Sequence, residues 1–460
     1  MLNVRFGTTI MLAFVLLGTG LVASPQKDEA EAVVQAPGLG NTDATETETV
    51  EEDGAETTDE QQVDIGELER RLDLLADEVE RLRSGEPTQE LSQTDARALG
   101  LAPSAAATYE RGPGVSLAGY GEMLYENFAA EDEAGLPSSK GTQFDFLRAI
   151  VYAGYRFNDK FLFNSEIEVE HSNEIFVEFA YVDYRAYENI GLRAGMLLVP
   201  MGLVNEFHEP TVFLGAERPV TERSIIPSTW RENGAGVYGA FDRVAFRAYV
   251  VNGFNGERFS ASGVRGGRQK GSKAKASHMA FTGRVDVTPT PGIFLGASLY
   301  TGGSGQGDIV VDDVDYDVRT TIVDVHGQMQ IRGLDLRALY AEAHLDDMAQ
   351  LNAVLGKTGT SGVAERMTGG YVQVGYNVLS QVGGNQGAAL TPYVRYEKVD
   401  TQKRLPFGFD RSLSTDGTYT VLGVELKPIS NIVVKVDHMW VSNKARGGLN
   451  QFNVNVGYAF

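Results

Sequence analysis

The last ten residues, Gln451-Phe452-Asn453-Val454-Asn455-Val456-Gly457-Tyr458-Ala459-Phe460, decide the fold. Large apolar side chains occupy every second position from Phe452 to Phe460, and polar or small residues lie between them. Because successive side chains of a strand point to opposite faces, one face of this segment suits lipid and the other suits water. Its length is that of a tilted strand that crosses a bilayer. The segment therefore predicts a membrane-spanning β-strand.

Runs with similar alternation recur along the chain from Val115 onward, and we expect about 16 strands. Every second connection is tight, as at 158–160 and 242–243, whereas intervening connections such as 200–233 are long. Short turns on one side and long loops on the other are typical of outer-membrane barrels, and a soluble β-sandwich has no reason to keep that parity. We therefore expect an all-β fold, an antiparallel transmembrane β-barrel over residues 115–460. The predicted strands begin near residues 115, 142, 161, 176, 191, 234, 244, 279, 293, 319, 334, 367, 388, 418, 432 and 449.

Four segments of different composition precede the predicted barrel. Residues 1–23 resemble a signal peptide that is cleaved on export, because their apolar run is too short to span a membrane. The acidic residues 24–64 are expected to form a disordered tether. The pattern of residues 65–84 predicts a short α-helical coiled coil, although a solitary amphipathic helix also fits so few heptads. Residues 85–114 are expected to form a linker. The coiled-coil seam consists of Ile65, Leu68, Leu72, Leu75, Val79 and Leu82.

Composition and motifs argue against an enzyme. The chain lacks cysteine, so disulfides, thiolate metal sites and cysteine nucleophiles are excluded. It has no phosphate-binding loop and no nucleophile elbow, and we expect no cofactor and no bound metal. His208 and Glu209, with Glu206 nearby, fall short of a metalloenzyme motif, which favours a role in fixing a loop by hydrogen bonds. About half of the net charge of -22 lies in the acidic tether, so the charge says little about a substrate.

Two charged runs fall in predicted external loops. The acidic run at 308–317 fits calcium binding, but a solvated loop is the simpler interpretation because the spacing of an EF-hand is missing. The basic run at 258–275 fits attraction of anions or lipopolysaccharide phosphates, or again a mobile solvated loop. Phe259 is the one aromatic residue of this run and does not alternate with its basic residues, so we expect no nucleic-acid partner.

A family resemblance lies between about residues 161 and 241. Its motifs are Arg193-Ala194-Gly195-Met196, Pro200-Met201-Gly202, His208-Glu209-Pro210, Arg218-Pro219, Ile226-Pro227-Ser228-Thr229-Trp230 and Gly234-Ala235-Gly236. With these motifs the chain resembles the phosphate-selective porins, a family of trimeric outer-membrane channels, and also porins with a periplasmic coiled coil before the barrel. The resemblance implies a homotrimer and a third external loop, roughly 200–233, that folds inward and narrows the pore. The constriction residues that it implies are His208, Glu209, Arg218, Arg223, Trp230 and Arg231.

The strand alternation assigns charges of both signs to the lumen, with Arg148 and Arg337 as further candidates. Selectivity for phosphate depends in that family on a ladder of arginines with few competing acids, so this mixture does not support it. Opposed charges instead indicate an aqueous, weakly selective pore. The predicted pore-lining residues are Arg193, Arg395, Lys435, Glu166, Glu168, Asp324, Glu397 and Asp437.

The sequence thus predicts an exported porin of the bacterial outer membrane, with its coiled coil in the periplasm. We expect passive diffusion of small hydrophilic solutes or ions, and contacts with outer-membrane lipid and lipopolysaccharide. The alternative is a structural or adhesive barrel that tethers the envelope through its coiled coil. Solute identity, ion preference and pore diameter are left open.

Overall fold

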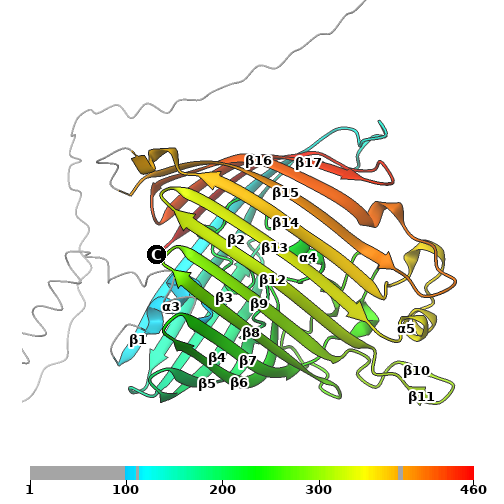
Figure 1. The fold of residues 1–460 in the computed structure, drawn as a ribbon, viewed down its shortest axis with the longest axis horizontal. Helices are drawn as coiled ribbons and strands as arrows, with labels where there is room; N and C mark the ends of the chain where they lie inside the picture. The colour runs from blue at the N-terminus through cyan, green and yellow to red at the C-terminus, as the bar shows by residue number, and fades with distance from the viewer. Residues whose placement is uncertain (1–98, 110–112, 382–386) are drawn as a thin grey trace, which may run out of the picture. The chain divides into compact units, whose positions relative to one another are not determined.

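A computed structural model describes residues 99–109, 113–381 and 387–460 (Figure 1). The predicted signal peptide, acidic tether and coiled coil, with its seam from Ile65 to Leu82, lie outside the described residues. Sixteen strands form one closed antiparallel barrel, which confirms the predicted architecture, and each begins within three residues of its predicted start. The strands are β1 (Gly114–Phe128), β2 (Gln143–Arg156), β3 (Phe161–Glu170), β4 (Glu174–Tyr187), β5 (Ile190–Leu198), β6 (Arg231–Phe241), β7 (Val244–Asn252), β8 (Met279–Thr290), β9 (Ile293–Gly303), β12 (Arg319–Ile331), β13 (Leu334–Leu345), β14 (Arg366–Tyr376), β15 (Ala389–Arg404), β16 (Asp416–Ile429), β17 (Ile432–Asn443) and β18 (Gln451–Ala459).

The barrel closes where the last strand pairs with the first. Tyr120 of β1 lies opposite Ala459 of β18, and Phe128 lies opposite Gln451. All sixteen strands therefore have partners on both sides, which leaves no open edge in the sheet. Closure of this kind lets every backbone group of a strand find a partner away from water.

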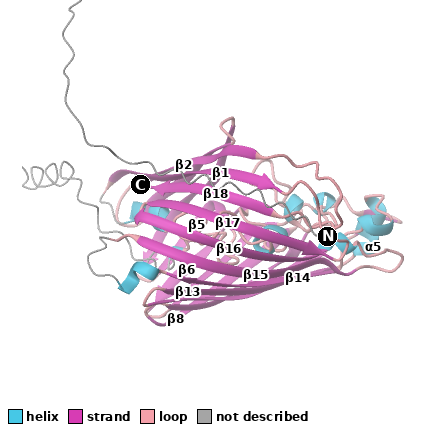
Figure 2. Cartoon of the chain, turned by 90° about the horizontal axis from the view of Figure 1, so that it is seen from above, coloured by secondary structure: helices cyan, strands magenta, loops and turns pink. Residues whose placement is uncertain are grey.

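Short turns and long loops lie at opposite ends of the barrel. Figure 2 shows loops and short helices gathered at the end where α5 lies. The end with the short turns has one longer connection, between β14 and β15, which contains η5 (Val378–Gln381). Among the described residues, no helix is both long and apolar enough to cross a membrane. The short elements of the long connections are α4 (Thr221–Ser224), η2 (Gly256–Arg258), η3 (Arg265–Gly267), β10 (Val310–Val311), β11 (Val314–Asp315), α5 (Met348–Val354), η4 (Gly359–Ser361) and η6 (Leu413–Thr415).

The two faces of the wall differ as the alternation predicts. On β12, Val325 is 58% exposed on the outside, whereas Asp324 is 2% exposed on the inside. On β3, Ile167 is exposed and the next inward residue, Glu168, is buried. An apolar outer wall around a charged inside is the pattern of a barrel that stands in lipid.

The inside of the barrel holds a packed core. Trp230 is fully buried, and its ring stacks on Phe254 with 4.6 Å between centroids and lies 4.7 Å from the ring of Tyr300. Two of the segments inside the barrel are residues 199–230 between β5 and β6, here called the inner loop, and residues 99–109, here called the N-terminal inner segment. The latter contains α3 (Pro103–Ala106) and η1 (Ala107–Tyr109).

Candidate pore and its inner loop

The inner loop leaves the wall and returns to it at one point. The Asn205 side chain donates hydrogen bonds to the carbonyls of Val199 (2.7 Å) and Trp230 (2.9 Å). In return, the backbone N–H of Trp230 donates to Asn205 Oδ1 (2.7 Å). Because Asn205 is fully buried, it holds the two ends of the loop together without competition from water.

On the opposite wall, four charged side chains of β15 and β17 bind the backbone of the inner loop. They are the predicted pore-lining residues Arg395, Glu397, Lys435 and Asp437, and all four point inward. Hydrogen bonds to charged groups are stronger than neutral ones, so these contacts fix the loop across the lumen. Their role in lining a solute path stays a prediction. The contacts join Lys435 Nζ to the carbonyls of Phe213 (2.8 Å) and Gly215 (3.1 Å), Arg395 Nη1 to the carbonyl of Glu217 (3.2 Å), the N–H of Ala216 to Asp437 Oδ2 (2.7 Å), and the N–H groups of Val220 (2.9 Å) and Thr221 (2.5 Å) to Glu397.

A buried carboxylate holds the fold of the loop itself. Glu222 accepts hydrogen bonds from the N–H groups of Leu203 (2.9 Å) and Val204 (2.7 Å) and from the Tyr371 hydroxyl (2.6 Å). Burial raises the pKa of Glu222 above its usual value, although these donors oppose the rise. Gly202 has φ +71°, and a Cβ there would lie 2.4 Å from Glu222 Oε2. The turn at Gly202 thus requires glycine.

A buried ionic network fills the space between the inner loop and β7, β8 and β12. Arg247 lies 3.0 Å from Glu206 and 2.6 Å from Asp286, and Arg284 lies 2.8 Å from Asp286. Asp324, predicted to be inward, lies 2.5 Å from His326 and 3.3 Å from the N–H of Gly202. Sequence reasoning missed Arg247, Arg284 and Asp286, although Arg284 and Asp286 stand two positions apart on one strand, which places both on the same face.

His208 and Glu209 bond to the protein on two sides of the inner loop. His208 Nδ1 lies 2.8 Å from the Asn205 carbonyl oxygen, and Nε2 lies 3.1 Å from Oε1 of Glu166, a predicted pore-lining residue. Glu209 accepts hydrogen bonds from the N–H (3.0 Å) and the hydroxyl (3.0 Å) of Ser104. Burial raises the pKa of the Glu209 carboxyl to about 7. Both side chains therefore join the loop to other parts of the barrel interior.

The N-terminal inner segment, within the region predicted as a linker, packs on the inner wall. Tyr109 bonds to Asp183, and Arg193 Nη2 donates to the Tyr109 hydroxyl (3.1 Å). Arg193, predicted to line the pore, is also paired with Asp183 at 2.8 Å. Asn164 donates to the Ala105 carbonyl (3.2 Å). The signal that sequence reasoning passed over is the run of small and apolar residues at 101–107.

Partly exposed arginines mark the long-loop side of the inner loop. Arg218 makes no ion pair within the described parts of the chain, whereas Arg223 pairs with Glu217 at 2.6 Å. The pKa of Arg218 lies below its usual value, mainly because the side chain is desolvated and secondly because the positive charge of Arg148 is nearby. The pKa of Arg265 is lowered to about 9, mainly by burial and secondly by the positive charge of Arg268. Cations that are desolvated and close to one another favour the approach of anions.

The basic run at 258–275 differs from a fully solvated loop. Phe259 and Val264 are buried, and Arg268 donates a hydrogen bond to the Pro227 carbonyl (3.1 Å). Arg265 donates to the Ser228 carbonyl. The apolar residues within this basic run explain the difference, because they carry part of the loop onto the inner loop.

Two further predicted residues are held in ion pairs on the inner wall. Arg231, predicted at the constriction, lies 2.6 Å from Glu178. Arg148 lies 2.9 Å from Glu122 and 3.2 Å from Glu168, a predicted pore-lining residue. Charges of both signs therefore meet on the wall of β1 to β6.

On the short-turn side of the inner loop lies a polar pocket of about 240 Å³. Its lining includes Arg337 and Lys427, which donate to the carbonyls of Val212 (2.9 Å) and Thr211 (2.7 Å). The pocket also has carboxylates, so charges of both signs meet there. A polar space of this size has room for water, and it reaches the inner loop from the end opposite the arginines.

Comparisons with known proteins identify the fold and one relative. No family model matches the chain, so the resemblance to phosphate-selective porins stays a prediction. The structure of OmpF of Salmonella typhi in complex with daunomycin matches with a TM-score of 0.50 and 14% identity, covering 75% of this chain and 97% of that one. The outer-membrane channel DcaP of Acinetobacter baumannii matches with a TM-score of 0.47 and 12% identity, covering 75% and 97%. At such identities the match to OmpF shows a shared fold.

An uncharacterized protein of Aquifex aeolicus (strain VF5) is 36% identical over 356 residues, which cover 74% of this chain and 78% of the relative. Identity at this level over most of both chains shows common descent. The chain belongs to the same family as this Aquifex aeolicus protein, and its barrel has the fold of outer-membrane porins.

Proposed function

We propose that the protein is a porin of the bacterial outer membrane, through which small hydrophilic solutes or ions diffuse passively. One observation carries the proposal: a closed barrel with an apolar outer wall has a charged inside that a long loop crosses from one wall to the other. A barrel built only as an anchor needs no charged inner wall, because apolar packing would fill it more stably.

The proposed solute path passes the inner loop at its partly exposed arginines. A solute enters from the long-loop end, passes Arg218, Arg223 and Arg265, and leaves through the polar pocket beside Arg337 and Lys427. Other inward charges are held in ion pairs, such as Arg193 with Asp183 (2.8 Å), or bind the backbone of the inner loop, as Glu397 does. The fixed charges that face the solute are therefore few, which supports weak selectivity.

The proposed oligomer is a homotrimer, with the cleaved chain in the outer membrane and the coiled coil in the periplasm. Support comes from the heptad pattern of 65–84 and from the resemblance to trimeric porins. Removal of residues 25–84 from the mature protein tests the coiled coil. The shortened chain should conduct as before. Light scattering measures the number of copies per oligomer, and a fall in this number would locate the trimer contacts in the coiled coil.

Liposome swelling tests the proposed permeability. Liposomes that contain the purified protein should swell in isotonic solutions of small sugars or amino acids, at rates that fall steeply as solute size increases. Liposomes with heat-denatured protein serve as the control. Rates equal to that control for every small solute would refute a passive diffusion pore.

A further inference from the structure

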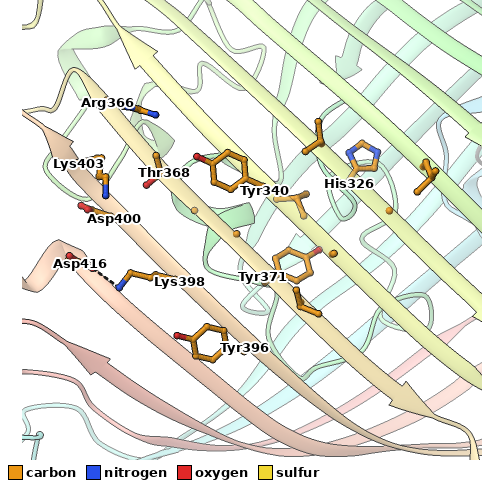
Figure 3. A pocket seen from close by; sticks show the side chains of 18 of the residues that line it. His326, Tyr340, Arg366, Thr368, Tyr371, Tyr396, Lys398, Asp400, Lys403 and Asp416 are labelled. Atoms are coloured by element: carbon orange, nitrogen blue, oxygen red, sulfur yellow. Dashed lines mark ion pairs between the residues drawn. The ribbon is translucent and has the colours of Figure 1, made fainter.

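A groove of about 910 Å³ lies on the outside of the barrel, over β12 to β15, and is called here the outer-wall groove (Figure 3). Gly327, Ala338, Val372 and Tyr396 stand opposite one another across these four neighbouring strands. Gly327 and Ala338 have side chains too short to fill the wall between larger neighbours. The groove is therefore a hollow in the face that meets lipid.

Aromatic and aliphatic side chains border this hollow. Tyr340 lies opposite Val325 on one side and Gly370 on the other. Tyr340 and Tyr396 are both exposed on the outer wall. Aromatic side chains with a polar tip are favoured where the membrane core meets its polar surface, so the hollow begins near that boundary.

One end of the outer-wall groove is cationic, and these charges gather on the left of Figure 3. Four basic side chains line this end against two carboxylates, a net charge of +2 in a chain whose total is -22. The end lies beside the long loops, because β14 begins and β15 ends there. The basic residues are Arg366, Lys398, Lys403 and Lys444, and the carboxylates are Asp400 and Asp416.

Arg366 is held by Glu342 at 2.8 Å, whereas the three lysines keep donors free for a ligand. Lys398 and Lys444 both pair with Asp416, at 3.1 Å and 2.5 Å, yet their side chains remain 57% and 55% exposed. Arg411 lies 3.1 Å from Asp416 and also pairs with Asp400, so these three cations share two carboxylates. Lys403 is exposed and makes no ion pair within the described ranges. The cluster can therefore accept further negative charge.

We propose that the outer-wall groove binds lipopolysaccharide through its lipid A portion. The acyl chains lie in the hollow over Gly327 and Ala338, and the phosphates bind Lys398, Lys403 and Lys444. The proposal rests on the proposed outer-membrane location, in which the long-loop end faces the leaflet that contains lipopolysaccharide. Charge complementarity selects this occupant. Lipid A has apolar acyl chains and negatively charged phosphates, and the groove has an apolar hollow and a cationic end.

Native mass spectrometry of the full-length protein in detergent tests the proposal, with lipid A, dephosphorylated lipid A and phosphatidylglycerol as probes. We expect lipid A to remain bound most strongly. The pair of substitutions Lys398→Gln and Lys444→Gln should weaken its binding about tenfold or more. Ala338→Leu should weaken the binding of lipid A and of dephosphorylated lipid A, because the larger side chain fills the hollow. The matched controls are Lys160→Gln, at a short turn, and Ala248→Leu, on the outer face of β7.

Several results would overturn the proposal. The first is that phosphatidylglycerol is retained as strongly as lipid A, and the second is that dephosphorylated lipid A is retained as strongly as lipid A. The third is that lipid A binding is unchanged both in the double lysine variant and in Ala338→Leu. Dissociation of the oligomer by Ala338→Leu would instead assign the groove to contacts between copies of the chain. Conductance is measured on the same samples and should not change in these variants. Wild-type protein that binds lipid A without conducting would refute only the channel.

Discussion

Glu397 offers the sharpest test of how the inner loop is held. Its carboxylate accepts the N–H groups of Val220 and Thr221 from across the lumen. Each hydrogen bond to a charged group contributes about 1.5–3 kcal/mol, so Glu397→Ala should cost the docked loop about 3–6 kcal/mol. Since about 1.4 kcal/mol is a factor of ten, the population of displaced loops should rise about a hundredfold or more. The lumen of the variant is then open for a larger fraction of the time.

Single-channel recording in planar bilayers measures this change. We expect Glu397→Ala to add larger or rapidly fluctuating conductance levels, and Glu397→Gln to show a smaller effect, because an amide oxygen still accepts hydrogen bonds. Gln373→Ala is the matched control. Gln373 lies on the neighbouring strand β14, two residues from the position opposite Glu397. Its side chain also points inward, is similarly buried and has the same size as that of Glu397. Conductance and noise in Glu397→Ala that equal those of Gln373→Ala would refute the anchoring role.

Three further predictions address the charge, the pH response and the backbone of the inner loop. Arg218→Glu should raise the permeability of cations relative to chloride about tenfold or more, because it changes the local charge by two units and each unit charge about 4 Å away contributes about 1 kcal/mol even in water. Reversal potentials in a salt gradient measure this, and an equal shift in the loop control Arg258→Glu would contradict it. Since the pKa of Glu209 is raised from 4.5 to about 7, the folded protein binds the proton more tightly than the unfolded chain. Stability should therefore fall as pH rises from about 4.5 to 7, by on the order of 3 kcal/mol at most; urea unfolding should show this loss in the wild type and not in Glu209→Gln, and equal pH dependence of the two would refute it. Gly202→Ala should lower the melting temperature more than Gly356→Ala, because both glycines have positive φ but only Gly202 has an atom within 4 Å of the added Cβ; equal shifts would show that the contact with Glu222 is unimportant.

The strands could be predicted from the sequence because their signal is local. Alternation from Phe452 to Phe460 is read within ten residues, and the tight turn at 242–243 follows directly from two adjoining runs. The inward direction of Arg395 and Glu397 follows from the same period of two. Local pattern therefore predicts both the number of strands and the face on which each side chain lies.

The contacts inside the barrel could not be predicted in this way. Glu397 and Val220 are 177 residues apart, and alternation says only that Glu397 points inward. Whether an inward charge meets water, another charge or the backbone depends on what fills the lumen. The N-terminal inner segment shows the same limit, because its small residues at 101–107 have no period of two and join the barrel only through distant partners such as Asn164.

Recording from single oligomers tests the central claim most directly. Purified, folded oligomer added to a planar lipid bilayer should produce stepwise increases in current, each step proportional to the applied voltage over a moderate range. Folding is checked on the same sample by circular dichroism and by heat-sensitive migration in gels. Folded oligomer that inserts into the bilayer but gives no current steps would contradict the account of this barrel as a porin.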